Sequence, residues 1–534
     1  MADKRADTPV ARRPRGGVAS EAARRAPPVR GQGPTHLTRD SLLDATSFAP
    51  TARTSGPAKE ATVPYRLPDR PDLERLRKQA KQLRRRADIG DPEAVALLTR
   101  YDPGSGPVTL ARAQRVLARA YGFAGWSRLR QHFATLAEWG REPAATADSD
   151  DPVDAFLRAA CLTYTGHYEP ARAPALLRGD PGLAEATAAT MAVCGAAAAL
   201  AELLRRDSAA VNRLTGPHRW PPLLYLCYGR LDLGDPVATL RVLLDAGADP
   251  NAGFLWGRLP SPFTALTGVL GGGERDEPVH PKAEVLATML LDAGADPNDN
   301  QGFYNRQFRP DDSHLLPLLS HGAGQPRPSP WRERLGSAYP SPAEMVGEHL
   351  RTAAAAGFTE RVRVLLAYGV DPNTQGYHPI LGDQTAYEVA VRHGQAAAAA
   401  LLADAGGRSA RLDDVDLLLA AALGGDGAAV DGLRSHGPAL VGRRPEAVRL
   451  AGELHDVGAI QRLLELGFGV DDTGPDGRTA LHEAAWRGDE AACSWLLAHG
   501  ADQTRRDRDF SATPADWAAH AGHAELAERL RVPN

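Results

Sequence analysis

A phrase that returns along the chain constrains the fold more than any other feature of this 534-residue sequence. LLDAGADPN begins at Leu243 and again at Leu290, and close variants begin at Leu365, Leu463 and Leu496. Each copy places two leucines before a glycine, which can close a helix in the left-handed conformation, and ends in polar residues that keep the helix from resuming. Repetition of this kind predicts an array of stacked helical units, in which neighbouring units supply the core that one unit cannot build alone.

The glycines of this phrase mark where each unit should end. Towards the C-terminus they stand 31, 30 and 33 residues apart, whereas the earlier gaps reach 47 residues. We expect a positive φ angle at each of them, because a residue with a β-carbon is strained there. The glycines expected to close helices are Gly247, Gly294, Gly322, Gly369, Gly406, Gly437, Gly467 and Gly500.

A second phrase opens the units, and its threonine is expected to cap the first helix. It reads TALT at Thr264, TAYE at Thr385, TALH at Thr479 and TPAD at Thr513. Pro514 then occupies the first helical position, where its missing N–H costs nothing. Two phrases in fixed order therefore define a unit of two helices joined by a tight turn.

The fullest unit, Asp476–Asp502, reads DGRTALHEAAWRGDEAACSWLLAHGAD. This unit resembles the ankyrin repeat in its turn, its cap, its alanine pair, its Gly-Asp break and its final Leu-Leu pair. The resemblance covers residues 150–534. The earlier half of that range is similar to a bacterial subfamily with long inserts. Residues 153–215 lose both phrases, and residues 303–322 are expected to keep only a second helix, interrupted by Pro317. The resemblance implies an all-α ankyrin-repeat solenoid with a concave groove, a protein-binding role and no reaction.

Ahead of the array, residues 1–68 are expected to form a disordered basic leader. They hold twelve Lys and Arg against six Asp and Glu, many prolines and no apolar period, so they cannot bury enough surface to offset the entropy of ordering. Such a segment either contacts nucleic acid or a membrane, or is simply solvated.

Residues 69–140 are expected to form a small helical module. Leu76, Ala80 and Leu83 recur at helical spacing and mark an apolar face, and the opposite face of the same helix is basic. The stretches ERLRKQAKQLRRRADIGDPEA and ARAQRVLARAYGFAGWSRLR resemble a module found ahead of ankyrin arrays in bacterial proteins, and this resemblance implies no activity. The basic face either binds phosphate groups or is a solvated surface.

No arrangement of residues indicates a reaction, and the chain is predicted not to be an enzyme and to hold no cofactor or metal. His482-Glu483 lacks the second histidine of a zinc helix and falls at the capping position of its repeat. Gly271–Gly273 lacks the Lys-Ser/Thr of a phosphate loop and is expected to be a flexible insert. Cys161 with His167 is the one neighbouring Cys/His pair in the sequence, and no third group is placed to orient it.

The bulk properties favour a protein of a reducing compartment. The net charge of −4 gives the whole chain no electrostatic reason to bind nucleic acid. The four cysteines form no CxxC pair, which argues against a disulfide framework or a zinc site. The N-terminus lacks the apolar core of a secretory signal. The least polar run, Ala186–Ala201, is mostly alanine and threonine and is followed by a glutamate, which argues against a membrane span. We therefore expect a cytoplasmic monomer without a membrane span.

The partner site is expected in the expanded middle of the array, residues 218–340, because standard repeats leave little room for long loops. Eleven of the 31 aromatic residues fall there, and aromatic and arginine side chains dominate binding hot spots. The rival hypothesis is that these rings fold the loops onto the array as small cores. The candidate partner-binding residues are Trp220, Phe254, Trp256, Arg258, Tyr304, Arg306, Phe308, Arg309 and Trp331.

Two functions stay open from the sequence. The first is a non-catalytic scaffold that binds an unidentified protein through the concave face and loops of the array. The second is association with nucleic acid or a membrane surface through the basic residues 1–86, with the array as an accessory. A salt titration separates them, because phosphate contacts weaken steeply with salt.

Overall fold

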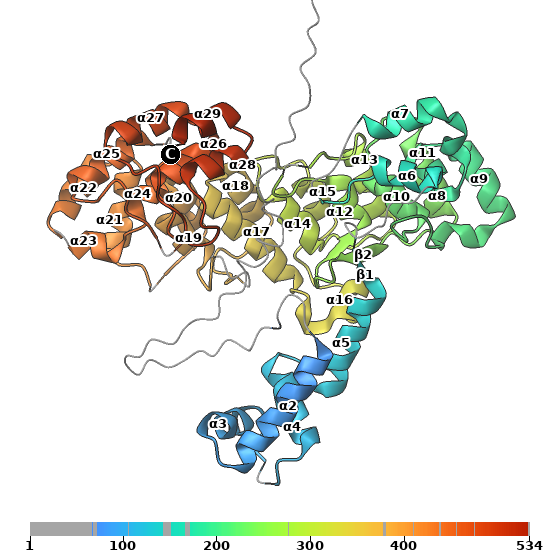
Figure 1. The fold of residues 1–534 in the computed structure, drawn as a ribbon, viewed down its shortest axis with the longest axis horizontal. Coiled ribbons are helices and arrows are strands. Elements are labelled where there is room, and N and C mark those ends of the chain that lie inside the picture. Colours follow the sequence, from blue (N-terminus) through green and yellow to red (C-terminus); the bar gives the residue numbers. More distant parts are fainter. Residues whose placement is uncertain are drawn as a thin grey trace, which may run out of the picture. The chain divides into compact units, whose positions relative to one another are not determined.

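Where the computed structural model describes the chain, it is built almost entirely of helices (Figure 1). The leader expected over residues 1–68 lies outside the described residues, except for Leu67. The structure describes residues 67, 72–104, 106–142, 151–165, 171–275, 277–376, 381–409, 411–436, 439–454, 456–474 and 476–531.

The N-terminal helices form a small module with its own apolar contacts. Asp72, Asp91 and Thr109 cap the first three helices, each through a side-chain oxygen that accepts a backbone N–H. Leu76 and Leu83 are buried on the inner face of the first helix, as their spacing predicts. The helices of the module are α2 (Leu73–Asp88), α3 (Pro92–Tyr101), α4 (Leu110–Ala120) and α5 (Trp126–Trp139).

The array is a series of helical hairpins. Its first helices are α6 (Pro152–Ala160), α8 (Ala188–Val193), α10 (Pro222–Tyr228), α12 (Ala265–Leu270), α14 (Asn300–Arg306), α17 (Pro342–Ala356), α19 (Ala386–Arg392), α21 (Asp414–Leu423), α24 (Ala447–Glu453), α26 (Ala480–Arg487) and α28 (Pro514–His520). The second helices are α7 (Arg172–Gly179), α9 (Ala197–Arg206), α11 (Pro236–Asp245), α13 (Ala283–Asp292), α15 (Leu315–Ser320), α18 (Thr359–Ala367), α20 (Ala396–Asp404), α22 (Gly427–Arg434), α25 (Val457–Glu465), α27 (Glu490–Ala498) and α29 (Ala524–Leu530).

First helices of neighbouring units pack side by side along the array. α8 lies against α10, α10 against α12, α17 against α19, and α26 against both α24 and α28. Small residues allow this close approach, and each unit thereby completes the core of the next. Short additional helices between these elements are η2 (Pro181–Glu185), η3 (Ser208–Asn212), α16 (Pro330–Leu335), η4 (Gly336–Ala338) and α23 (Ala439–Arg443).

Both local signals that the sequence carries are present in the structure. The φ angle is positive, between +80° and +95°, at every expected closing glycine except Gly437, which lies outside the described residues. Thr264, Thr385, Thr479 and Thr513 each accept the N–H of the residue three positions on, and that residue's side chain accepts theirs in return. This reciprocal pair is a capping box, and it fixes the start of each first helix.

Three more capping boxes begin at Thr187, Ser341 and Asp413, where the sequence shows no opening phrase of the threonine type. Serine and aspartate cap as threonine does, because each offers a short side-chain oxygen. The cap that opens a repeat is therefore present at Thr187, although the sequence of residues 153–215 shows neither phrase.

The unit at residues 303–322 differs from the expectation that only a second helix remains. Its first helix is α14, which is capped by the carboxylate of Asp299 through the N–H of Gly302 at 3.0 Å. Pro317 lies in the first turn of α15, where a backbone N–H has no helical partner, so the proline does not interrupt the helix. The unit therefore has both helices, with α14 packed against α12 and α17, and α15 packed against α13.

The prediction of a flexible insert at Gly271–Gly273 is wrong. The three glycines are buried, with φ angles of +60°, +77° and +104°. Gly272 forms a β-bridge with Glu277, and the N–H of Gly273 donates to the carbonyl of Asn305 at 2.7 Å. Glycine is needed here because the backbone turns through the left-handed region in a crowded place.

A three-stranded sheet departs from the helical pattern of the described residues. Its strands are β1 (Gly140–Arg141), β2 (Gly253–Trp256) and β3 (Pro262–Thr264), in the order β1-β2-β3. β2 and β3 form an antiparallel hairpin inside the first long insert, and β1 pairs in parallel with β2. Since β1 follows α5 directly, the sheet joins the module to the array.

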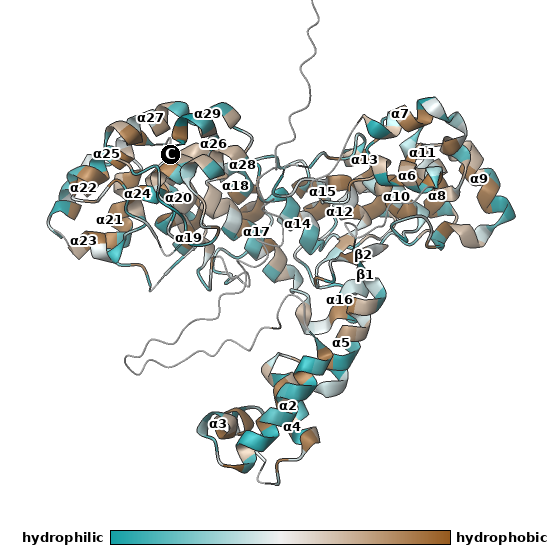
Figure 2. Ribbon diagram, in the orientation of Figure 1, coloured by the Kyte–Doolittle hydropathy of each residue, from teal (hydrophilic) through white to brown (hydrophobic). Residues whose placement is uncertain are grey.

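The buried apolar side chains form two main clusters. One extends from Leu136, at the end of α5, to Leu402 in α20, and the other from Val415 in α21 to Leu530 in α29. The module contains smaller clusters of its own. Figure 2 shows α2, by contrast, as a largely hydrophilic ribbon.

Candidate functional site

Several of the aromatic rings in the central inserts are anchors in the core. Trp220 and Phe254 are each 1% exposed and stack with their ring centroids 5.0 Å apart. Phe254 also stacks on Phe263, at 5.6 Å. These rings fasten the β2–β3 hairpin to the array, so neither Trp220 nor Phe254 has surface to offer a partner.

Trp331 is buried where the module meets the array. Its indole N–H donates to the carbonyl of Asn251 at 3.1 Å, and its ring lies edge to face with Trp139 at 5.3 Å. The guanidinium of Arg334 lies 4.4 Å from the ring centroid of Trp139 and 4.8 Å from that of Trp331. A cation over two indoles stabilises this junction, because each ring carries a negative face.

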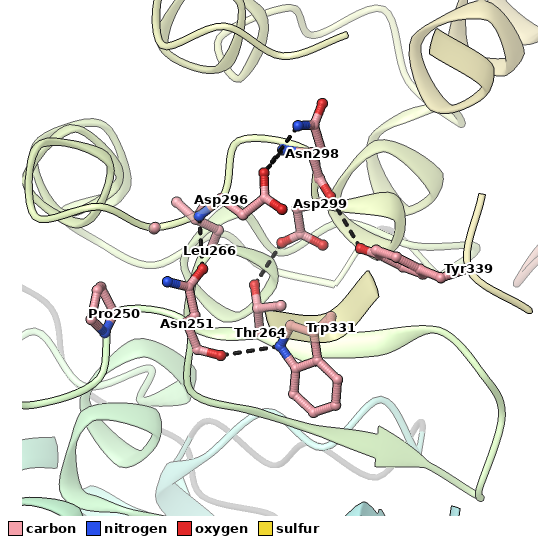
Figure 3. Close-up of a pocket in the computed structure, with 10 residues that line it drawn as sticks. Pro250, Asn251, Thr264, Leu266, Asp296, Asn298, Asp299, Trp331 and Tyr339 are labelled. Carbon is pink, nitrogen blue, oxygen red and sulfur yellow. Dashed lines mark hydrogen bonds between the residues drawn. The ribbon is translucent and has the colours of Figure 1, made fainter. Parts of the chain in front are cut away.

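A small cavity lies beside this anchor (Figure 3), lined in part by Asn251 and Trp331. Its volume of about 10 Å³ is room for one water molecule. The carboxylate of Asp299 accepts hydrogen bonds from Thr264 at 2.7 Å and from Thr267 at 2.8 Å, and burial raises the pKa of this carboxyl. The cavity is too small for an organic ligand, so the network is a structural tie between two repeats.

Trp256 and Arg306 are also engaged inside the molecule. Trp256 is half-buried, and its indole N–H donates to the carbonyl of Thr163 at 2.9 Å. Arg306 is buried, donates to the carbonyl of Leu270 at 3.3 Å and forms an ion pair with Asp311.

The other four members of the candidate set keep exposed surface. Arg258, at the turn of the β2–β3 hairpin, and Arg309 are exposed, and Phe308 is 37% exposed. Tyr304 is half-buried; its hydroxyl donates to Glu274 at 2.7 Å and its ring lies edge to face with Phe308 at 5.4 Å. The structure thus brings Tyr304, Phe308 and Arg309 together at the end of α14 and leaves Arg258 apart from them.

Sequence reasoning missed a group of aromatic side chains on the last two repeats. Trp486 in α26 is 39% exposed, lies edge to face with Trp517 of α28 at 5.5 Å and stacks on His520 at 5.8 Å. Phe510 adds a ring 6.1 Å from Trp517, whose N–H donates to Asp507 at 2.7 Å. A signal was available, since Trp486 and His520 each stand seven residues after the capping threonine of their helix.

His520 is the exposed histidine in this group of rings. Burial lowers the pKa of His520, and the positive charge of Arg275 lowers it further. Arg275 follows Glu274, the residue that accepts the hydrogen bond from Tyr304. We refer to Trp486, Trp517 and His520 together as the aromatic surface.

Charged side chains of the first helices near this surface are paired with one another. Arg449 lies 3.1 Å from both Glu453 and Glu483, and Arg478 lies 3.2 Å from Glu483 and 2.7 Å from Asp476. Burial raises the pKa of Glu483 although two arginines face it. These pairs connect α24 to α26, and they leave the exposed rings as the distinctive chemistry of this part of the array.

The residues that resemble catalytic groups have structural contacts. His482 is buried; its Nδ1 accepts the N–H of Thr479 at 3.1 Å and its Nε2 donates to the carbonyl of Ala512 at 3.2 Å. Cys161 is buried, which raises the pKa of its thiol, and His167 lies outside the described residues. Among the residues described, no three His, Cys, Asp or Glu side chains are grouped to hold a metal ion, and no helix is long and apolar enough to cross a membrane.

Comparison with known proteins agrees with the geometry of the C-terminal repeats. The family model described as "Ankyrin repeats (3 copies)" matches residues 446–532, the segment that contains the hairpins α24–α25, α26–α27 and α28–α29. No curated protein matches the chain. Outside the matched segment, capped first helices and glycine-closed second helices of the same kind occur between Gly247 and Gly406. The chain is therefore an ankyrin-repeat protein.

Proposed function

We propose that this protein is a non-catalytic scaffold that binds another protein through the aromatic surface. Ankyrin repeats generally mediate protein–protein interaction. The observation that carries the proposal is Trp486, which keeps 39% of its side chain exposed next to a second tryptophan. Tryptophan is prominent among binding hot spots, and a repeat does not need an exposed indole for its own core.

The charge of the array favours a partner with a cationic contact surface. Residues 143–534 hold 35 Lys and Arg against 51 Asp and Glu, so the array is strongly acidic although the whole chain is nearly neutral. An acidic field of this kind steers a cationic partner towards it and raises the association rate at low salt. Exposed indoles can in turn stack on the arginine side chains of such a partner.

The exposed members of the central inserts extend the proposed contact. Tyr304, Phe308 and Arg309 are proposed as further partner contacts, because they lie together at the end of α14 and keep exposed surface. Trp220, Phe254, Trp256, Arg306 and Trp331 are engaged inside the molecule and are not part of this proposal.

The experiment compares two tryptophans of one repeat. Tagged wild-type protein, a Trp486→Ala variant and a Trp495→Ala variant would be used to capture proteins from a lysate of the source cells. Trp495 is the matched control, because it lies on the second helix α27, where its half-buried ring stacks on His499 at 3.7 Å. We expect a protein that wild type and Trp495→Ala retain and that Trp486→Ala loses. Equal capture by all three proteins would rule out the aromatic surface as the binding site.

We also propose that the protein acts as a monomer in the cytoplasm. Its four cysteines are buried and form no disulfide, and burial raises the pKa of Cys194 and of Cys493 to about 12, which suits a reducing compartment. Light scattering should give a mass near 56.8 kDa for the purified chain. A mass of twice that value would contradict the monomer.

A further inference from the structure

Positive charge is concentrated at the N-terminal end of the chain. Residues 1–142 hold 27 Lys and Arg against 15 Asp and Glu, the reverse of the balance in the array. Within the described module, residues 72–142, the counts are 14 and 8. Because the array is acidic, this basic part requires a partner of different chemistry from the one proposed for the array.

The basic residues of α2 are of two kinds. Arg77 pairs with Glu74, and Arg86 pairs with Asp91 at 2.9 Å and with Glu93 at 2.6 Å. Five others, Arg84 among them, are exposed and form no ion pair with any described carboxylate. The remaining four are Arg75, Lys78, Lys81 and Arg85, and we call them the cationic face.

The cationic face extends along most of the length of α2. At 1.5 Å per residue, the stretch from residue 75 to residue 85 is about 15 Å long. Like charges three or four residues apart on a helix repel one another and destabilise it. Elsewhere in the described chain arginines commonly lie beside carboxylates, as Arg449 and Arg478 do. A row of uncompensated cations therefore indicates an anionic ligand outside the protein.

The shape of α2 favours one anionic surface over the other. Its apolar residues Leu76, Ala80 and Leu83 are buried in the module, so the helix has no apolar side free to enter a lipid bilayer. Its exposed arc is wide, since Arg84 lies on one flank of the cationic face. A flat membrane would contact only the middle of this arc. The major groove of duplex DNA is about 12 Å wide, similar to the diameter of a helix, so its walls place phosphates on both sides of the helix.

We propose that the cationic face of α2 binds the phosphate backbone of duplex nucleic acid. The contacts are charge-assisted hydrogen bonds from arginine and lysine to phosphate oxygens, and they carry no base sequence. β1 and the Trp139–Trp331 contact hold the module against the central repeats, so one chain presents a phosphate-binding face and a protein-binding face together.

The test uses the full chain and a fluorescein-labelled 20-base-pair DNA duplex of arbitrary sequence. Fluorescence anisotropy would give the affinity at several NaCl concentrations for wild type and for a Lys78→Glu/Lys81→Glu/Arg85→Glu variant. The matched control is Arg241→Glu/Arg327→Glu/Arg408→Glu, which makes the same change in net charge at exposed positions of the array. Circular dichroism melts would show that all three proteins remain folded.

We expect the wild type to bind with a salt slope that includes about −3.6 from four phosphate contacts. The α2 variant should bind at least about tenfold more weakly in 100 mM NaCl, with a slope smaller in magnitude by about 2.7. The control should bind as wild type does. Equal weakening in both variants would show that binding follows net charge alone, and an unchanged affinity in the α2 variant would place binding elsewhere; either result overturns the proposal. Binding of the wild type to phosphatidylserine vesicles but not to DNA would overturn it too.

Discussion

Acid should weaken the array through two histidines that are buried beside α14. The Nε2 atoms of His314 and His349 lie 3.0 Å apart, and the ring of Phe303 lies 5.2 Å from that of His349. Burial lowers the pKa of both imidazoles well below the ordinary value, and the charges of Arg361 and Arg306 lower it further. Both rings are therefore neutral in the folded protein at pH 7 and remain so in mild acid.

The sign of the effect follows from the unfolded state. There each histidine titrates near pH 6.5, so the unfolded chain binds protons that the folded chain refuses as the pH falls below that value. The contribution to the free energy of unfolding is complete above about pH 6.5 and is lost progressively below it. Between pH 6.5 and pH 5.5 each such histidine costs about 1 kcal/mol, and the pair costs about 2 kcal/mol.

Urea unfolding at pH 7.5, 6.5 and 5.5 would measure this loss in wild type and in a His314→Leu/His349→Phe variant. The other buried histidines contribute equally to both proteins. The unfolding free energy of wild type minus that of the variant should therefore fall by about 2 kcal/mol from pH 6.5 to pH 5.5. Hydrogen exchange in α15 and α17 gives a local reading that does not require two-state unfolding. A His499→Gln variant, changed at an exposed ring, is the control. A difference that stays constant across these pH values would refute the reasoning.

Three further predictions concern packing. Trp220→Ala should lower the free energy of unfolding by about 3–5 kcal/mol in urea, because the ring is fully enclosed, and a loss below about 1 kcal/mol would contradict its role as an anchor. Gly272→Ala should lower the urea midpoint of unfolding more than Gly500→Ala. The β-carbon added at Gly272 would lie 2.6 Å from the carbonyl oxygen of Asn305, whereas the β-carbon added at Gly500 would have no neighbour within 4 Å. Equal midpoints would show that the close approach at Gly272 is absent. Trp139→Ala should speed hydrogen exchange in α5 while leaving α26 unchanged, and unaltered exchange in α5 would mean that the indole pair does not hold the module.

The parts of the fold that could be predicted are those that depend on a few neighbouring residues. A capping threonine such as Thr479 acts on a residue three positions away, and a closing glycine such as Gly500 acts on the helix just before it. Both signals are therefore visible in a single sequence. The caps at Ser341 and Asp413 were missed because several residue types can fill the capping position, so the sequence of that position is not the same in every repeat.

The position of the central inserts was not predictable in the same way. Their aromatic content was visible, but whether a ring faces a partner or the core depends on distant segments. Gly140 pairs with Leu255, 115 residues later, and Trp331 meets Trp139 across a still larger separation. Those contacts decide which candidate residues are buried, and no local pattern indicates them.

Trp486 was overlooked for a different reason. The long inserts stand out in the sequence because they depart from the repeat, whereas Trp486 lies inside the most regular unit. Comparing equivalent positions of the first helices would have found it, since the seventh position after the cap carries Trp486 in one repeat and His520 in the next. Bulky side chains at a position that neighbouring repeats share form a continuous surface.

The central claim is that a partner protein sits on the aromatic surface, and site-specific photocrosslinking tests it most directly. A benzophenone amino acid would replace Trp486 in one version of the chain and Trp495 in another, and both would be irradiated in the cells that produce the protein. The account predicts a discrete adduct with one other protein from position 486 and no such adduct from position 495. An identical set of adducts from both positions, or an adduct from position 495 alone, would contradict it.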